Sequence, residues 1–97
     1  MATYISLFRY TQQGITSIKQ APGRIDAARQ AYRALGAELK ALYLVMGQYD
    51  FVALVEAPDD TVAAKAALAL GSRGNVSSET LRAFTEDEFR NIVAGLP

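Results

Sequence analysis

The chain has 97 residues, 51% of them hydrophobic, with ten basic and ten acidic side chains and neither cysteine nor histidine. This length fits a single domain over residues 1–97, and the missing residue types exclude disulfides, thiolate metal sites and histidine bases or ligands, so we expect no cofactor or metal. The balanced charge gives no electrostatic footprint for nucleic acid or an anionic membrane.

The N-terminal part of the chain predicts a strand followed by a helix. Residues 3–10 are rich in β-branched and aromatic types, as strands are, and residues 11–21 form a polar connection. Pro22 marks a helix start because its fixed φ suits the first turn, and Gly36 stands where a left-handed residue ends a helix. The apolar residues between them recur at helical spacing: Ile25, Ala28, Tyr32 and Leu35.

Two apolar strands follow, over residues 38–46 and 49–57. Only Gly47 and Gln48 lie between them, which predicts a tight antiparallel hairpin. Pro58 then ends the second of these strands, because proline cannot donate to a sheet ladder.

The C-terminal part predicts a helix, a strand and a terminal helix. Asp59 and Asp60 precede an alanine-rich helix over residues 62–70, residues 71–75 form a turn cluster, and residues 76–84 read as a strand.

A capping box marks the terminal helix. Thr85 is the expected N-cap, and Glu88 stands three residues later, where its side chain can bond back to the cap. Phe84 and Phe89 occupy the staple positions around this cap, and Ile92 continues the apolar stripe. This is the most specific local signal in the chain.

The element order β, α, β, β, α, β and a terminal α predicts an α+β fold of βαββαβ type. Two crossovers around a central hairpin give a four-stranded antiparallel sheet with helices on one face. Right-handed crossovers place the first and third strands in the middle of the sheet.

The strands are apolar on both faces, which is unusual for a sheet with helices on one side only. The third strand carries Phe51, Ala53 and Val55 on one face and Val52 and Leu54 on the other. On the second strand, alternation predicts that Leu39, Ala41, Tyr43 and Val45 lie on one face and that Leu42, Leu44 and Met46 lie on the other. We therefore expect a homodimer or higher homo-oligomer that covers the second face. The alternative is that the terminal helix folds across this face of its own sheet.

Several separated motifs resemble the GYD-domain family, which is named for a G-x-Y-D turn. They are MGQYDFVALVEAPDD, TQQGITSIKQAPGR, ALALGSRGNVSSETLRAF and TEDEF, and together they extend along almost the whole chain. The resemblance implies a ferredoxin-like fold of the dimeric α/β-barrel kind, in which two sheets face each other. It implies no catalytic residues, so the catalytic residues stay unknown.

The first candidate site is the GQYD turn. Tyr49 and Asp50 would line a pocket at the edge of the sheet, with Asp50 as acid, base or ligand anchor. The competing interpretation is turn chemistry, in which Gly47 supplies a positive φ and Asp50 accepts backbone N–H bonds.

The second candidate site consists of strand arginines near tyrosines. Arg9 and Arg82 interrupt otherwise apolar strands, and with Tyr43 they form a possible binding site for a carboxylate or phosphate, a small organic or anionic ligand. The alternative is an ion pair at an interface, with Glu38, Glu56 or Glu79 as partners. Whether the two arginines meet is left open by the sequence.

Three further groups have structural interpretations. Residues 71–75 are glycine-rich but precede a strand, whereas phosphate loops precede a helix, so a turn is expected. The acids at 86–88 fit the first turn of a helix better than a metal site. Lys19, Arg24 and Arg73 are a possible small basic rim.

Two functions remain open. The favoured one is a homo-oligomeric small-molecule-binding or regulatory protein, because no nucleophile has a partner base. The alternative is a cofactor-independent enzyme, monooxygenase- or isomerase-like, that uses Tyr49, Asp50 or Arg82 and needs a cavity of about 300 Å³. With no apolar run of about 18 residues and no signal-peptide pattern at the N-terminus, a cytoplasmic location is expected.

Overall fold

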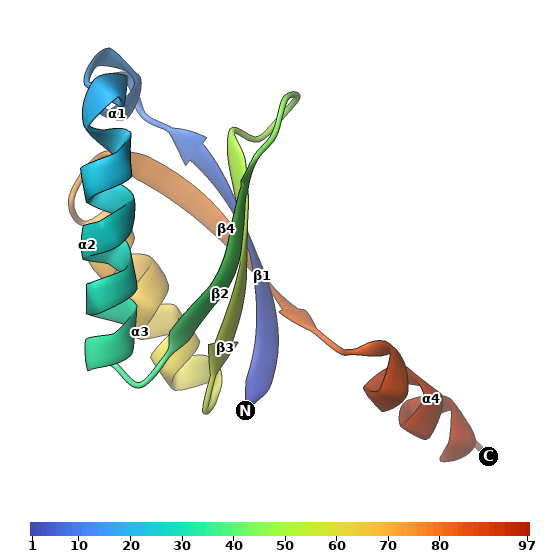
Figure 1. Cartoon of the computed structure of the whole chain (residues 1–97). Helices are drawn as coiled ribbons and strands as arrows, with labels where there is room; N and C mark the ends of the chain where they lie inside the picture. Colours follow the sequence, from blue (N-terminus) through green and yellow to red (C-terminus); the bar gives the residue numbers. More distant parts are fainter.

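The computed structural model describes all residues from 1 to 97. It has the predicted order of main elements, and the connection expected over residues 11–21 contains two further short helices. These elements are β1 (Ala2–Tyr10), α1 (Gln12–Thr16), a short 3-10 helix (Ile18–Gln20), α2 (Ala21–Ala34), β2 (Glu38–Leu44), β3 (Phe51–Ala57), α3 (Asp60–Gly71), β4 (Val76–Ala83) and α4 (Glu86–Ala94). The strands form one antiparallel sheet in the order β2-β3-β1-β4, with α2 and α3 on one face (Figure 1). The α+β, ferredoxin-like fold and the central position of the first and third strands are therefore confirmed.

The core lies between this sheet face and the two helices. Phe8 of β1 and Phe51 of β3 stack with ring centroids 4.4 Å apart, and both are buried. On the helix side, Ala63 and Ala66 of α3 are buried against the sheet. Small side chains let the helix approach closely, so these alanines define the distance between the layers.

Local signals begin and end the helices where the sequence indicates. Pro22 lies in the first turn of α2, and Gly36 follows that helix with φ of 87°. Asp59 caps α3, because its Oδ1 accepts from the Val62 N–H at 2.9 Å.

The predicted capping box is present at α4. The Thr85 hydroxyl accepts from the Glu88 N–H at 3.1 Å, and the Glu88 carboxylate accepts from the Thr85 N–H at 2.9 Å. The Thr85 N–H holds the pKa of Glu88 below its usual value. The cap therefore fixes where the chain turns from β4 into this helix.

The hairpin between β2 and β3 is longer than predicted. The strands end at Leu44 and resume at Phe51, so the two-residue connection through Gly47 and Gln48 is wrong. The positive φ expected at Gly47 is present, at 136°. The Val45 N–H donates to the Asp50 carbonyl at 3.0 Å across the hairpin, so residues 46–49 form the turn, while the Asp50 N–H donates to the Phe8 carbonyl of β1 at 2.8 Å.

A β-bulge in β2 changes which side chains of the strand point to each face of the sheet. Leu39 lies opposite Val55, but the next paired residue of β2 is Ala41, opposite Leu54, so Lys40 is an extra residue. Leu39 therefore shares the helix-covered face with Leu42, whereas Ala41 and Tyr43 lie on the other face. The predicted grouping of Leu39 with Ala41 and Tyr43 is wrong, because one extra residue reverses every later side chain.

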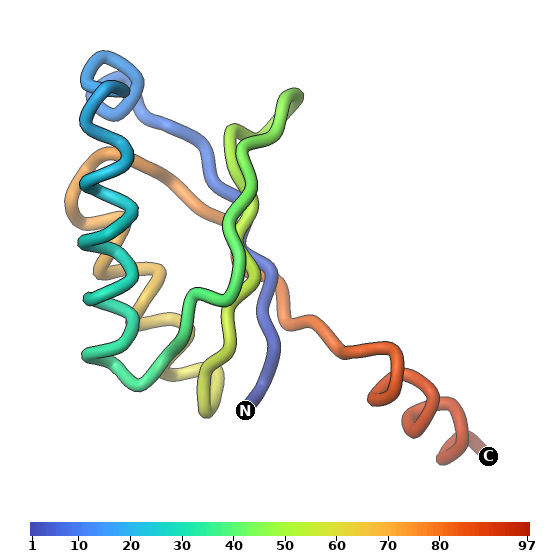
Figure 2. Tube along the Cα trace, in the orientation of Figure 1, coloured from blue at the N-terminus to red at the C-terminus, as the bar shows by residue number.

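The second face of the sheet has no cover and is called the open face below. It carries apolar side chains from all four strands: Ile5, Leu7, Tyr43, Val52, Leu54 and Leu81. Helix α4 projects away from the sheet beyond β4 (Figures 1 and 2), so the predicted alternative that it folds across this face is not observed. The apolar side chains of α4, among them Phe89 and Ile92, are exposed as well.

Candidate functional site

Three side chains meet at the hairpin end of the open face. Tyr49 donates its hydroxyl to Glu79 Oε2 of β4 at 2.7 Å. The guanidinium of Arg9, on β1, lies 4.6 Å from the centre of the Tyr49 ring, and its Nε donates to the Gln48 carbonyl at 2.6 Å. The cluster thus ties the hairpin to the two neighbouring strands.

This cluster holds its groups in fixed, unreactive roles. The hydrogen bond to the Glu79 carboxylate raises the pKa of Tyr49, so the phenol stays protonated at neutral pH and acts as a donor. Arg9 forms no ion pair with Glu79; its Nε donates to the Gln48 carbonyl instead.

Asp50 faces the backbone of β1. Its Oδ2 accepts from the Tyr10 N–H at 2.8 Å, while its own N–H donates to Phe8. Both bonds hold the start of β3 against the end of β1. The structure therefore favours the turn interpretation of Asp50 over a role as acid or base.

The remaining two candidates lie elsewhere. Tyr43 is 65% exposed near the C-terminal end of β2, opposite Val52. Arg82 lies opposite Tyr4, on the helix-covered side of the sheet, and its guanidinium packs 4.4 Å from the Phe84 ring centre. Because Arg9 and Tyr4 are five positions apart on β1, the two arginines are separated by about 17 Å along the strand and do not meet.

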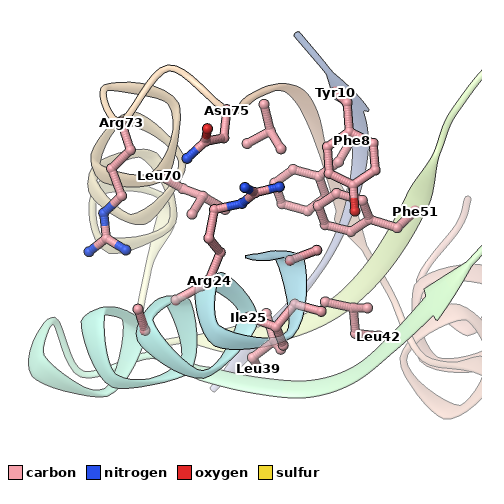
Figure 3. Close-up of a pocket in the computed structure, with 14 residues that line it drawn as sticks. Phe8, Tyr10, Arg24, Ile25, Leu39, Leu42, Phe51, Leu70, Arg73 and Asn75 are labelled. Carbon is pink, nitrogen blue, oxygen red and sulfur yellow. The ribbon is translucent and has the colours of Figure 1, made fainter. Parts of the chain in front are cut away.

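A cavity lies between the sheet and the helices, and most of its lining residues are ones that sequence reasoning did not name as candidate site residues. Its volume is about 90 Å³, and 11 of its 14 lining residues are hydrophobic. The polar residues at its wall include Arg24, Arg73 and Asn75 (Figure 3). The expected basic rim indicated this cavity in part. Arg24 and Arg73, two of its three members, line the cavity, whereas Lys19 does not.

The two remaining motifs are structural. Gln13 Nε2 donates to the Arg73 carbonyl and to Asn75 Oδ1, so the glycine-rich turn is bound to α1. Among the acids of α4, Glu86 pairs with Arg90 at 2.7 Å. No three carboxylates gather as metal ligands, and no helix is long and apolar enough to cross a bilayer.

Fold and site together define a βαββαβ domain with an open apolar sheet face. Residues 4–93 match the GYD domain, and the chain belongs to the GYD-domain family. The family's turn corresponds to Gly47, Tyr49 and Asp50.

A curated relative and a solved structure, both from Thermus thermophilus, are similar to this chain. The relative is named glutamine synthetase and cystathionine beta-lyase binding protein; it is 42% identical over 84 residues, which cover 86% of this chain and 88% of the relative. The solved structure is the crystal structure of TTHA0845, which superposes with a TM-score of 0.50 at 31% identity, over 88% of this chain and 95% of the other. The relative's name describes a binding protein.

Proposed function

We propose that this protein is a non-catalytic, homo-oligomeric binding protein that regulates other proteins by contact. The observation that carries the proposal is the open face, an apolar surface on four strands that nothing in the chain covers. Soluble monomers rarely expose a continuous apolar patch of this kind. Such a patch is typical of a surface that is buried on association.

A second copy of the chain is the proposed cover. Two open faces packed sheet on sheet would remove Leu54, 39% exposed, and Leu81, 43% exposed, from water on both copies. A two-fold arrangement uses the same patch twice, so one surface satisfies both subunits. The family resemblance supports the same dimeric barrel.

The catalytic alternative has less support. The cavity of about 90 Å³ is well below the roughly 300 Å³ that a drug-sized organic substrate needs. Tyr49 and Asp50 are both engaged in structural hydrogen bonds. No specific observation in the structure favours an enzyme.

The relative's name supports protein partners. We propose that this chain, 42% identical to a glutamine synthetase and cystathionine beta-lyase binding protein, likewise binds enzymes, in the cytoplasm. The exposed stripe of α4, which projects beyond the sheet, is a second surface available for such contacts.

Self-association is tested first, by native mass spectrometry and light scattering at micromolar concentration. Leu54→Lys places a charge on the open face and is expected to give monomers, whereas the control Leu68→Lys, at a 74% exposed position of α3, is expected to leave the assembly intact. A wild-type species of 10.5 kDa would refute the proposed assembly.

Partner binding is tested separately with purified enzymes. The assembled protein is immobilised and exposed to glutamine synthetase and to cystathionine beta-lyase from the same organism, with Leu54→Lys as the comparison. We expect saturable binding of at least one enzyme. Binding of neither enzyme would refute the partner assignment while leaving the assembly unaffected.

A further inference from the structure

We propose that the cavity on the helix-covered face binds a small aliphatic carboxylate, with the Arg24 guanidinium as its anion anchor. The cavity lies between α2 and the sheet, on the side opposite the open face. It is therefore accessible whether or not a second copy covers the open face, and the proposal does not depend on self-association.

The walls of the cavity favour an apolar ligand body. Phe8 and Phe51 stack 4.4 Å apart, and the Tyr10 ring lies 5.4 Å from that of Phe51, so one wall is aromatic. Leu39 and Leu70 contribute from the strand and helix on either side. If one water-sized group needs about 10–15 Å³, then the 90 Å³ present hold roughly six to nine non-hydrogen atoms. A short branched carboxylic acid has this size.

Arg24 supplies unused hydrogen-bond donors at this wall. Its Nη1 donates to the carbonyl and the hydroxyl of Ser17, both at 2.9 Å, and its Nη2 donates to the Gly14 carbonyl at 3.1 Å. A guanidinium has five N–H groups, so the Nε–H and one N–H of Nη2 have no acceptor within the chain. These neighbouring nitrogens form an edge that binds a carboxylate through two parallel hydrogen bonds.

The charge of Arg24 has no counter-ion. Its three acceptors are neutral oxygens, and none of the ion pairs in the structure includes it. A half-buried cation beside apolar walls is stabilised by a paired anion, because burial of an unpaired charge is costly. Figure 3 shows the Arg24 side chain extending toward the centre of the cavity, whereas Arg73 turns away from it.

Asn75 adds a neutral donor at the same wall. Its Oδ1 accepts from Gln13, which fixes the orientation of the amide, and its Nδ2 donates to no group of the chain. One interior cation, one amide donor and eleven hydrophobic residues match an acid with an apolar chain. A phosphate would carry more charge than this wall compensates and would leave the aromatic side of the cavity unfilled.

The test compares isovalerate with isovaleramide, its neutral analogue of nearly equal shape, by NMR titration of the whole protein. We expect isovalerate to shift the amide signals of Phe8, Leu70 and Val76, and to bind at least about tenfold more tightly than the amide, because a bidentate charged pair is lost with the amide. Arg24→Gln should remove this preference, and Arg24→Lys should retain part of it. The control Arg33→Gln alters an exposed arginine of the same helix and should behave as wild type.

Two results would overturn the proposal. One is equal affinity for the acid and the amide, or no shift of the cavity signals at saturating isovalerate. The other is unchanged preference in Arg24→Gln. If that variant unfolds because α1 loses its bonds to the guanidinium, Ala27→Leu decides, since it fills the cavity from α2 and leaves Arg24 in place. Binding that survives Ala27→Leu unchanged would exclude the cavity as the site.

Discussion

Replacing Asp50 by alanine tests whether this residue of the GQYD turn is structural. The Asp50 carboxylate accepts from the half-buried Tyr10 N–H at 2.8 Å and is one of the side-chain links between the hairpin and the end of β1. Asp50→Ala removes the acceptor and leaves that N–H without a partner. Asp50→Asn keeps an oxygen at the same place but removes its charge.

The expected loss follows from the kind of hydrogen bond. Hydrogen bonds to charged groups contribute about 1.5–3 kcal/mol, and an unsatisfied buried donor costs a similar amount. We expect Asp50→Ala to lower the free energy of unfolding by about 2 kcal/mol, which corresponds to a fall in Tm of roughly 8–16 °C for a domain of this size. Asp50→Asn should lose about half as much, because a neutral acceptor remains.

Thermal unfolding followed by circular dichroism measures these changes. Asp26→Ala is the control, because Asp26 is exposed on α2 and makes no hydrogen bond or ion pair, so its Tm should stay near that of wild type. All variants are compared at one protein concentration, since association makes Tm concentration-dependent. A wild-type Tm for Asp50→Ala, together with loss of partner or ligand binding, would show that the reasoning is wrong and that Asp50 belongs to a functional site.

Two further predictions concern stability. Burial raises the pKa of Tyr32 to about 12 from 10.0, so the stabilisation that comes from its neutral form is complete below pH 10 and is lost as the pH rises toward 12. Denaturant titrations should show that the free energy of unfolding falls by about 3 kcal/mol over this range. The Tyr32→Phe variant, which has no ionisable group at this position, should show a correspondingly smaller fall. Gly14→Ala would place a Cβ 2.0 Å from the Asn75 carbonyl oxygen, whereas Gly23→Ala meets nothing within 4 Å. In the same denaturant assay we expect Gly14→Ala to destabilise the protein by about 3 kcal/mol or more. We expect Gly23→Ala to be neutral or to stabilise it by about 0.5 kcal/mol. Equal stabilities of the two variants would contradict the close packing of α1 against the 71–75 turn.

The predictable part of the fold rests on local signals. Pro22 and Gly36 bound α2, Asp59 caps α3, and Thr85 with Glu88 caps α4, and each signal acts within a few residues of itself. The sheet order followed from the element order because crossovers are right-handed. These features need no knowledge of distant contacts, so the sequence is sufficient to predict them.

The parts that sequence reasoning missed depend on contacts between distant segments. Asp50, at the end of the wider hairpin, bonds to Tyr10 of β1, which is 40 residues away in the sequence. The candidate site divides for the same reason: the pairing of β1 with β4 places Arg82 beside Tyr4 and leaves Arg9 with Tyr49 at the other end. The cavity requires α2 and α3 to be placed on the sheet, and no residue pattern specifies that spacing. Of the polar residues that line it, sequence reasoning had named Arg24 and Arg73, as members of the expected basic rim.

The bulge at Lys40 has a consequence for how substitutions along β2 should be compared between relatives. Because the strand has leucines on both sides of the bulge, an alignment displaced by one residue would still match apolar with apolar while exchanging inward and outward positions. A saturation scan of β2 should show this directly. Tolerance to polar substitution should be low at Leu39, high at Lys40 and again high at Ala41 in a monomeric background, with alternation resuming at Leu42. Two tolerant positions in succession would thus reveal, from phenotype alone, where a relative carries its extra residue.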